Sequence, residues 1–86
     1  MVSVEIRTLR EGERATRLLD RLEGEIGVVG IEVIGGRLFA VEAADWPAAS
    51  ARLDDILTRV AGDQWREYLA FVAPQGYERP ASRDRL

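Results

Sequence analysis

Residues 2–8, VSVEIRT, alternate between apolar and polar side chains. This period of two predicts a strand with one buried face. Over residues 13–23 the period lengthens, and apolar side chains recur at every third or fourth position. They are Ala15, Leu18, Leu19 and Leu22. A single stripe of this kind predicts an amphipathic helix that packs on a sheet. We expect Gly24 and Gly27 to end this helix and Gly12 to begin it.

Residues 28–43, VVGIEVIGGRLFAVEA, predict a β-hairpin around a glycine pair. A two-residue turn of Gly35 and Gly36 is a strong hairpin signal, but it leaves neither face apolar. A three-residue loop, with a bulge at Gly36, separates the faces better, and a slip of one residue moves every apolar side chain to the other face. We therefore expect the bulged register. Its core face would hold Val29, Ile31, Val33, Phe39, Val41 and Ala43, and its outer face Gly30, Glu32, Ile34, Leu38, Ala40 and Glu42.

Helical periodicity resumes after the hairpin. Asp45 is a good N-cap, Pro47 suits the first turn, and Gly62 is expected to end the helix. The apolar face of this helix consists of Trp46, Ala49, Leu53, Ile56, Leu57 and Val60. A last strand is expected over residues 64–73. It would place Trp65, Leu69 and Phe71 on one side and Tyr68, Ala70 and Val72 on the other.

The expected order is strand, helix, strand, strand, helix, strand, which is the split βαβ pattern of ferredoxin-like α+β folds. Right-handed crossovers then predict a four-stranded antiparallel sheet, in the order 4-1-3-2, with both helices on one face. This βαββαβ sandwich would be a single domain over residues 1–73. Residues 74–86, with two prolines, a glycine and no periodicity, are expected to form a flexible C-terminal tail.

The amino-acid composition limits the kinds of catalysis and metal binding that this chain can support. The 86 residues include no cysteine, histidine, lysine or asparagine, and the net charge is −3. A thiol nucleophile and a zinc–thiolate site are therefore excluded, and we expect no catalytic residue, no metal and no cofactor. The mildly acidic body, and the lack of aromatic residues at the expected outer positions of the first and third strands, argue against binding to nucleic acid. No segment has the length of a membrane span, so we expect a cytoplasmic protein with no membrane partner.

The segment from residue 2 to residue 73 resembles the ACT-type regulatory domains, which are small βαββαβ modules that bind amino acids or related metabolites at dimer interfaces. The shared features are Gly12 in the first strand–helix loop, a leucine-rich first helix and a glycine-rich approach to the second strand. The chain departs from the family at Glu11, where a proline is usual, and at EIGVV, where an asparagine is usual. The resemblance implies a dimeric regulatory module.

Two groups of residues are candidate sites. The first is a line of arginines at the start of the first helix, which could bind an anion there or could simply be a solvated flank balanced by acidic neighbours. The line consists of Arg14, Arg17 and Arg21, with Arg10 in the loop before it, and the residues expected to bind a ligand are Arg10, Gly12, Arg14 and Arg17. Glu5, Glu32 and Glu42 could ligate a hard cation, although cross-strand ion pairs with Arg7 and Arg66, which are expected on the same face, explain them more simply.

The second candidate site is an apolar strip on the outer sheet face, which a monomer would expose to water. It consists of Ile34, Leu38, Ala40, Tyr68, Ala70 and Val72. A chain this short buries only about 60% of its unfolded surface, so dimerisation would stabilise it. We expect a non-catalytic binding or regulatory module that forms a homodimer and holds a small ligand near its interface. The alternatives are an inhibitor or accessory subunit that docks on a protein partner through the sheet face or the tail, and a small enzyme with a pocket enclosed by two sheet faces.

Overall fold

The computed structural model describes residues 1–74, and the predicted tail lies outside this range apart from Pro74. The described chain contains four strands, two α-helices and one 3₁₀ helix. In chain order these are β1 (Val2–Thr8), α1 (Glu13–Ile26), β2 (Ile31–Val33), β3 (Gly36–Val41), α2 (Trp46–Ala61), η1 (Asp63–Glu67) and β4 (Leu69–Val72).

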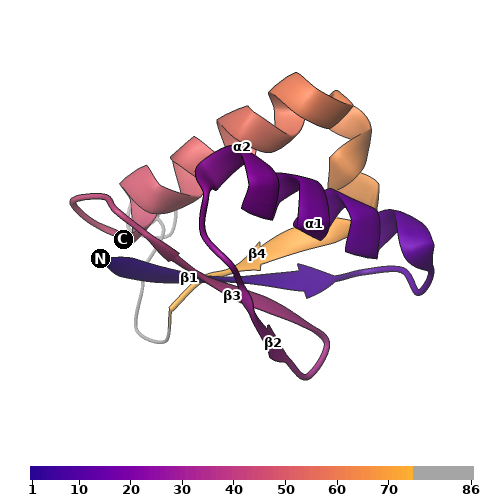
Figure 1. Cartoon of the computed structure of the whole chain (residues 1–86), viewed down its shortest axis with the longest axis horizontal. Helices are drawn as coiled ribbons and strands as arrows, with labels where there is room; N and C mark the ends of the chain where they lie inside the picture. Colours follow the sequence, from indigo (N-terminus) through magenta and orange to yellow (C-terminus); the bar gives the residue numbers. More distant parts are fainter. Residues whose placement is uncertain (75–86) are drawn as a thin grey trace, which may run out of the picture.

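The strands form one antiparallel sheet in the order β2-β3-β1-β4. This is the predicted order 4-1-3-2 read from the opposite edge. Both helices lie on the same side of the sheet, and no helix of residues 1–74 lies over the other side (Figure 1). The predicted α+β architecture is confirmed. No helix within residues 1–74 combines the length and the apolar character needed to cross a membrane.

The core lies between the helices and the sheet. Its fully enclosed side chains come from every layer: Val4, Ile6, Leu22, Phe39, Leu53, Leu57 and Leu69. The helix stripes predicted from the sequence supply about half of the buried core, since Ala15, Leu19, Ala49 and Ile56 are buried together with the enclosed leucines of both helices. The N-cap prediction is also confirmed, because the carboxylate of Asp45 accepts a hydrogen bond from the Ala48 backbone N–H at 2.9 Å.

Helix α1 is longer than predicted. It continues through Gly24 and ends at Gly27, which has a φ of 71° and donates its backbone N–H to the Glu23 carbonyl. A residue with positive φ at this position is the usual way to end a helix, and glycine adopts it without strain. Gly24 has no such geometry, so the prediction that it helps to end the helix was wrong.

The predicted register of the hairpin was wrong. Val33 pairs with Gly36 and Ile31 pairs with Leu38, so the turn has two residues, Ile34 and Gly35. Gly35 has a φ of 79°, which a turn of this kind requires at its second central position. Phe39 and Val41 face the core as expected, whereas the side chains of β2 are reversed. Ile31 and Val33 lie on the outer side of the sheet and Glu32 lies on the helix side.

The reversal leaves Glu32 exposed on the edge strand, and Arg37, its partner on β3, faces the helices opposite Ile6. Its guanidinium donates to Asp20 at 2.8 Å and to Glu23 at 3.0 Å, and its side chain is only 11% exposed. Partial burial acts to lower the pKa of Arg37, but the hydrogen bonds and negative charges of Asp20 and Glu23 outweigh it and raise this pKa above its ordinary value. An arginine stem can cover apolar surface while its charge is paired, so this polar residue does not have to face outward.

Two glycines allow the hairpin to pack this closely. A Cβ at Gly30 would meet the side chains of Arg37 and Phe39 at 2.7 and 2.9 Å. A Cβ at Gly36 would collide with the backbone carbonyl of Ile6 on the neighbouring strand. Since backbone atoms of a paired strand cannot move aside cheaply, the central β1–β3 pairing needs glycine at position 36.

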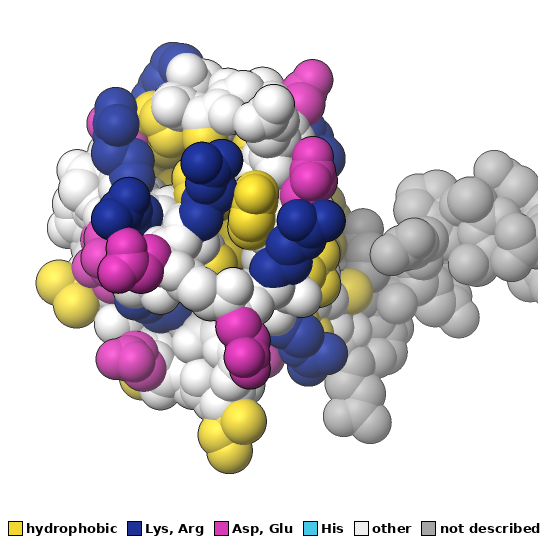
Figure 2. Space-filling view, turned by 90° about the vertical axis from the view of Figure 1, so that its right-hand side faces the viewer, with side chains coloured by type: hydrophobic (Ala, Val, Ile, Leu, Met, Phe, Trp, Pro, Cys, Tyr) yellow, Lys and Arg dark blue, Asp and Glu magenta, His cyan; other side chains and the backbone are white. Residues whose placement is uncertain are grey.

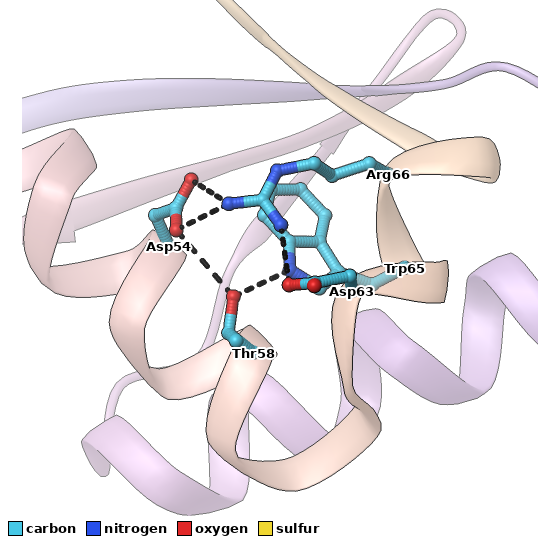
Figure 3. A network of polar contacts seen from close by, with 5 residues as sticks. All are labelled: Asp54, Thr58, Asp63, Trp65 and Arg66. Carbon is cyan, nitrogen blue, oxygen red and sulfur yellow. Dashed lines mark hydrogen bonds and ion pairs between the residues drawn. The ribbon is translucent and has the colours of Figure 1, made fainter.

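The last strand begins later than predicted, because residues 63–67 form η1. The Trp65 indole donates to the Thr58 hydroxyl at 3.0 Å (Figure 3). Arg66 donates to both carboxylate oxygens of Asp54, at 2.8 and 3.0 Å, and to Asp63 at 3.0 Å. These contacts fasten η1 to α2, and they bury Trp65 as part of a 3₁₀ turn rather than of a strand.

Candidate functional site

The side of the sheet that carries no helix is the largest candidate site, and we call it the outer face. It carries ten side-chain positions that alternate with the buried ones along the four strands. They are Ser3, Glu5, Arg7, Ile31, Val33, Gly36, Leu38, Ala40, Ala70 and Val72. Six of these are aliphatic or alanine, so the outer face is mainly apolar.

Several of these apolar side chains are open to solvent. Ile31 is 65% exposed and Val33 is 36% exposed, whereas Leu38 and Val72 are half-buried by their neighbours on the sheet. Val29, just before β2, is 81% exposed. Single exposed apolar residues are ordinary, but a contiguous group on one sheet face is typical of an interaction surface.

The outer face is also hollowed. An open hollow of about 370 Å³ lies between the ends of β1, β3 and β4. Ser3 and Glu5 supply its polar atoms, and Leu38, Trp46 and Val72 are among its apolar walls. Its volume lies at the small end of the range that small-molecule sites occupy, about 300 to 1,000 Å³. A cover over this hollow would turn it into an enclosed site.

One acidic and one basic side chain lie at the centre of the outer face. Glu5 is opposite Leu38 on β3 and Val72 on β4, and Arg7 is opposite Gly36 and Ala70. Both belong to β1, which is flanked by a strand on each side. In the described part of the chain neither forms an ion pair. Their charges are therefore not neutralised by a neighbour within residues 1–74.

The four residues predicted as a ligand site, three arginines and Gly12, divide into two pairs. Arg10 and Arg14 both lie over the ring of Tyr68, with their guanidinium carbons 5.4 and 5.5 Å from its centroid. Arg10 also approaches Glu67, at 3.7 Å. Figure 2 shows this end of the molecule, where dark blue arginines and magenta acidic side chains surround yellow apolar ones. Cation–π contacts at exposed sites contribute about 0.5 to 1 kcal/mol each, so this cluster also helps to hold the start of α1 near β4.

The other two members lie further along the start of α1. Gly12 is the N-cap and has no side chain to cap the helix, and Arg17 donates to Glu13 at 2.7 Å. Together with Thr16 they line an open hollow of about 410 Å³. The structure therefore does not bring Arg10, Gly12, Arg14 and Arg17 together around one space. Their role in binding a ligand stays a prediction.

Two residues of the predicted apolar strip are placed elsewhere. Ile34 lies in the turn of the hairpin and is fully exposed there. Tyr68 precedes β4, and its ring packs against the core beneath the two arginines. The prediction that both lie on the outer face was wrong. Leu38, Ala40, Ala70 and Val72 do lie on it, and Ile31 and Val33 are the apolar members that the sequence reasoning assigned to the core.

The three glutamates considered as cation ligands are not on one surface. Glu5 lies on the outer face, Glu32 lies on the helix side, and Glu42 follows the end of β3. Arg66, expected on the same face, instead pairs with acidic residues of α2 and η1. Within residues 1–74 no three acidic side chains gather as a metal site would require.

Comparison with models of known protein families, with curated proteins and with solved structures gives no match. The likeness to ACT-type domains therefore stays a prediction from the sequence, and function has to be argued from the surfaces of the molecule.

Proposed function

We propose that this protein is a non-catalytic binding module that works as a homodimer, in which the outer faces of two copies meet and enclose a small ligand. The observation that carries this proposal is the one-sided sheet, because both helices of residues 1–74 lie on one face (Figure 1). The other face carries exposed apolar side chains such as Ile31 and Val33. A domain of this size has a small core, so burying a second face would add substantially to its stability.

The outer face suits a second copy better than the β2 edge of the sheet does. The edge strand β2 has only three residues in the ladder. Next to it, the Gly30 backbone N–H donates to the Glu23 carboxylate at 2.9 Å and is thereby withdrawn from pairing with another strand. Short and covered edges are how proteins prevent edge-to-edge association. Contact through the face therefore explains more of the exposed apolar surface.

The hollow on the outer face is where this proposal puts the ligand. A second sheet packed about 10 Å away would cover the hollow and turn an open surface into a closed site. The walls are largely apolar, with the Ser3 hydroxyl and the Glu5 carboxylate as polar groups. This supports a small, mainly apolar ligand with at least one hydrogen-bond donor.

Substitution of Ile31 by glutamate tests the proposal. The variant should fold, because Ile31 is 65% exposed, but it should be a monomer at concentrations where the wild-type chain is a dimer. Ile34→Glu is the matched control, since it introduces the same charge three residues away in the turn, and it should remain dimeric. Sedimentation equilibrium measures both. If Ile31→Glu dimerises as well as the control does, the outer face is not the interface.

The ligand is tested separately. Thermal unfolding of the wild-type dimer in the presence of individual amino acids and related small metabolites should reveal a compound that raises the melting temperature with its concentration. A folded monomer of the wild-type chain would instead favour the alternative function, docking on a different protein.

A further inference from the structure

The charges at the centre of the outer face determine how two copies can meet. From the positions of Glu5 and Arg7 we infer that the two β1 strands cross in opposite directions, with Glu5 of each copy against Arg7 of the other. This inference rests on the proposed homodimer. It adds the orientation of the subunits and the residues that select it.

The two side chains have the right spacing. Glu5 and Arg7 are two positions apart on one strand, so both project from the same face. The buried residue between them, Ile6, marks the midpoint. A two-fold axis that lies between the sheets, perpendicular to β1 and above Ile6, exchanges the two positions. Each carboxylate then faces a guanidinium, and the interface gains two identical ion pairs.

The other simple arrangement is excluded by the same charges. If the axis ran along β1, the strands would be parallel, and Glu5 would face Glu5 while Arg7 faced Arg7. Like charges opposed across an interface that excludes water repel strongly, and such repulsion is a common way of rejecting a wrong orientation. Of the two arrangements, only the antiparallel crossing places opposite charges against each other, with Glu5 of one copy facing Arg7 of the other.

The surroundings explain why the pairing would be specific. Glu5 and Arg7 have no ion-pair partner among the described residues, and they lie within the apolar side chains Leu38, Ala70 and Val72. Apolar contacts supply most of the affinity of such an interface, whereas the few charges at its centre fix register and orientation. An outer face with one charge of each sign is complementary to itself, as a two-fold interface requires. A second copy is therefore the partner that it fits.

Exchange of the charges tests the orientation. Glu5→Arg gives an outer face with two arginines, and Arg7→Glu gives one with two glutamates. Each variant alone should dimerise at least about tenfold more weakly than the wild-type chain. An equimolar mixture of the two should form heterodimers, because opposite charges then meet at both positions. The double variant Glu5→Arg/Arg7→Glu should form homodimers again.

The control variants change the charges of an ion pair that forms within one chain. Glu13 and Arg17 pair at 2.7 Å on the exposed side of α1, so Glu13→Arg and Arg17→Glu make the same charge changes on the opposite side of the molecule. Both should dimerise like the wild-type chain. Circular dichroism of each variant establishes that it is folded, and Glu5→Gln and Arg7→Gln, each with a smaller loss of affinity, serve where a reversal prevents folding.

The outcomes separate this inference from the function on which it rests. If Ile31→Glu abolishes the dimer but the mixture of charge variants forms no heterodimer and the double variant does not recover, the outer face is the interface and the antiparallel crossing is wrong. If the single variants dimerise like the wild-type chain, the same conclusion holds. If Ile31→Glu leaves the dimer intact, the proposed function itself fails.

Discussion

The two faces of the sheet differ in how their polar groups are satisfied. On the face under the helices, the one charged residue of β3 is Arg37, and α1 supplies Asp20 and Glu23 to pair with it. On the outer face, Glu5 and Arg7 are the charged residues of β1, and nothing in the described chain pairs with either. Within residues 1–74 the charged residue of β3 on the first face is paired by α1, whereas the outer face carries both exposed apolar surface and two charges without an ion-pair partner.

This difference marks the face on which the proposed second copy would bind. Phe39 and Leu38 are neighbours on β3, yet Phe39 is fully buried by the helices and Leu38 is only half-buried by the sheet around it. The same strand therefore contributes to folding with one side and is available for association with the other. Substitutions on the two sides should have separable effects on unfolding and on dimerisation.

The largest effect is expected from Phe39→Ala, which removes the largest fully buried side chain. It should lower the free energy of unfolding by about 3 to 5 kcal/mol, because the core would lose apolar contacts and gain a cavity. Leu38→Ala, one residue away on the outer face, should cost less than about 1 kcal/mol in the monomer and should weaken dimerisation instead. Urea unfolding at low protein concentration measures the free energy of unfolding of the monomer. Equal losses for the two variants would show that the faces do not differ in this way.

An intermediate effect is expected from Gly36→Ala. The added methyl group meets the Ile6 carbonyl, so β1 and β3 must separate, and the free energy of unfolding should fall by about 1 to 3 kcal/mol. Gly24→Ala is the control, because nothing lies within 4 Å of a Cβ at this helical position. It should stabilise the protein by about 0.5 to 1 kcal/mol. Chemical denaturation measures the free energy of unfolding of both variants. If Gly36→Ala leaves this free energy unchanged, β1 and β3 are not packed this closely.

The smallest of the three effects is expected from Arg37→Met. The methionine keeps apolar bulk but leaves Glu23 without its cation, and the loss should be about 1 to 2 kcal/mol because Asp20 is largely exposed and adds little. Arg17→Met, which breaks an exposed pair on α1, should have no measurable effect.

The pH dependence of the Arg37 pairing follows from the raised pKa of this residue. A cation whose folded-state pKa is raised contributes its full stability below its ordinary pKa, and it loses that stability only when the pH rises past the folded value. The difference between the wild-type chain and Arg37→Met should therefore stay constant from about pH 6 to 9. A difference that disappears toward the upper end of this range would contradict the assignment.

Most of the fold could be predicted from the sequence, since periodicity identified β1, both helices and their apolar stripes, and the order of elements implied the sheet order. The hairpin register could not be predicted by separating apolar from polar residues. The guanidinium of Arg37 reaches carboxylates that are 14 and 17 residues away in the chain, and only the folded structure brings them together. The start of β4 was misplaced for a similar reason, because Trp65 and Arg66 are held by Thr58 and Asp54 of α2.

The errors in the hairpin register and in the start of β4 also affected the prediction of the candidate site. The outer face was identified from Leu38, Ala40, Ala70 and Val72, which alternate with buried residues on β3 and β4. Ile31 and Val33 were missed because their side of the strand depends on the register. The pairing of Arg10 and Arg14 with Tyr68 was missed because Tyr68 was expected on the strand, on the opposite side of the sheet. Local patterns predict which segments are strands, but contacts between distant residues decide which side of a strand is buried.

The native mass of the wild-type chain decides whether a second copy covers the outer face. Light scattering across a dilution series should give twice the chain mass of 9.6 kDa at high concentration and fall toward 9.6 kDa as the dimer dissociates. A mass of 9.6 kDa at every concentration would contradict the homodimer and leave the outer face to a different protein partner.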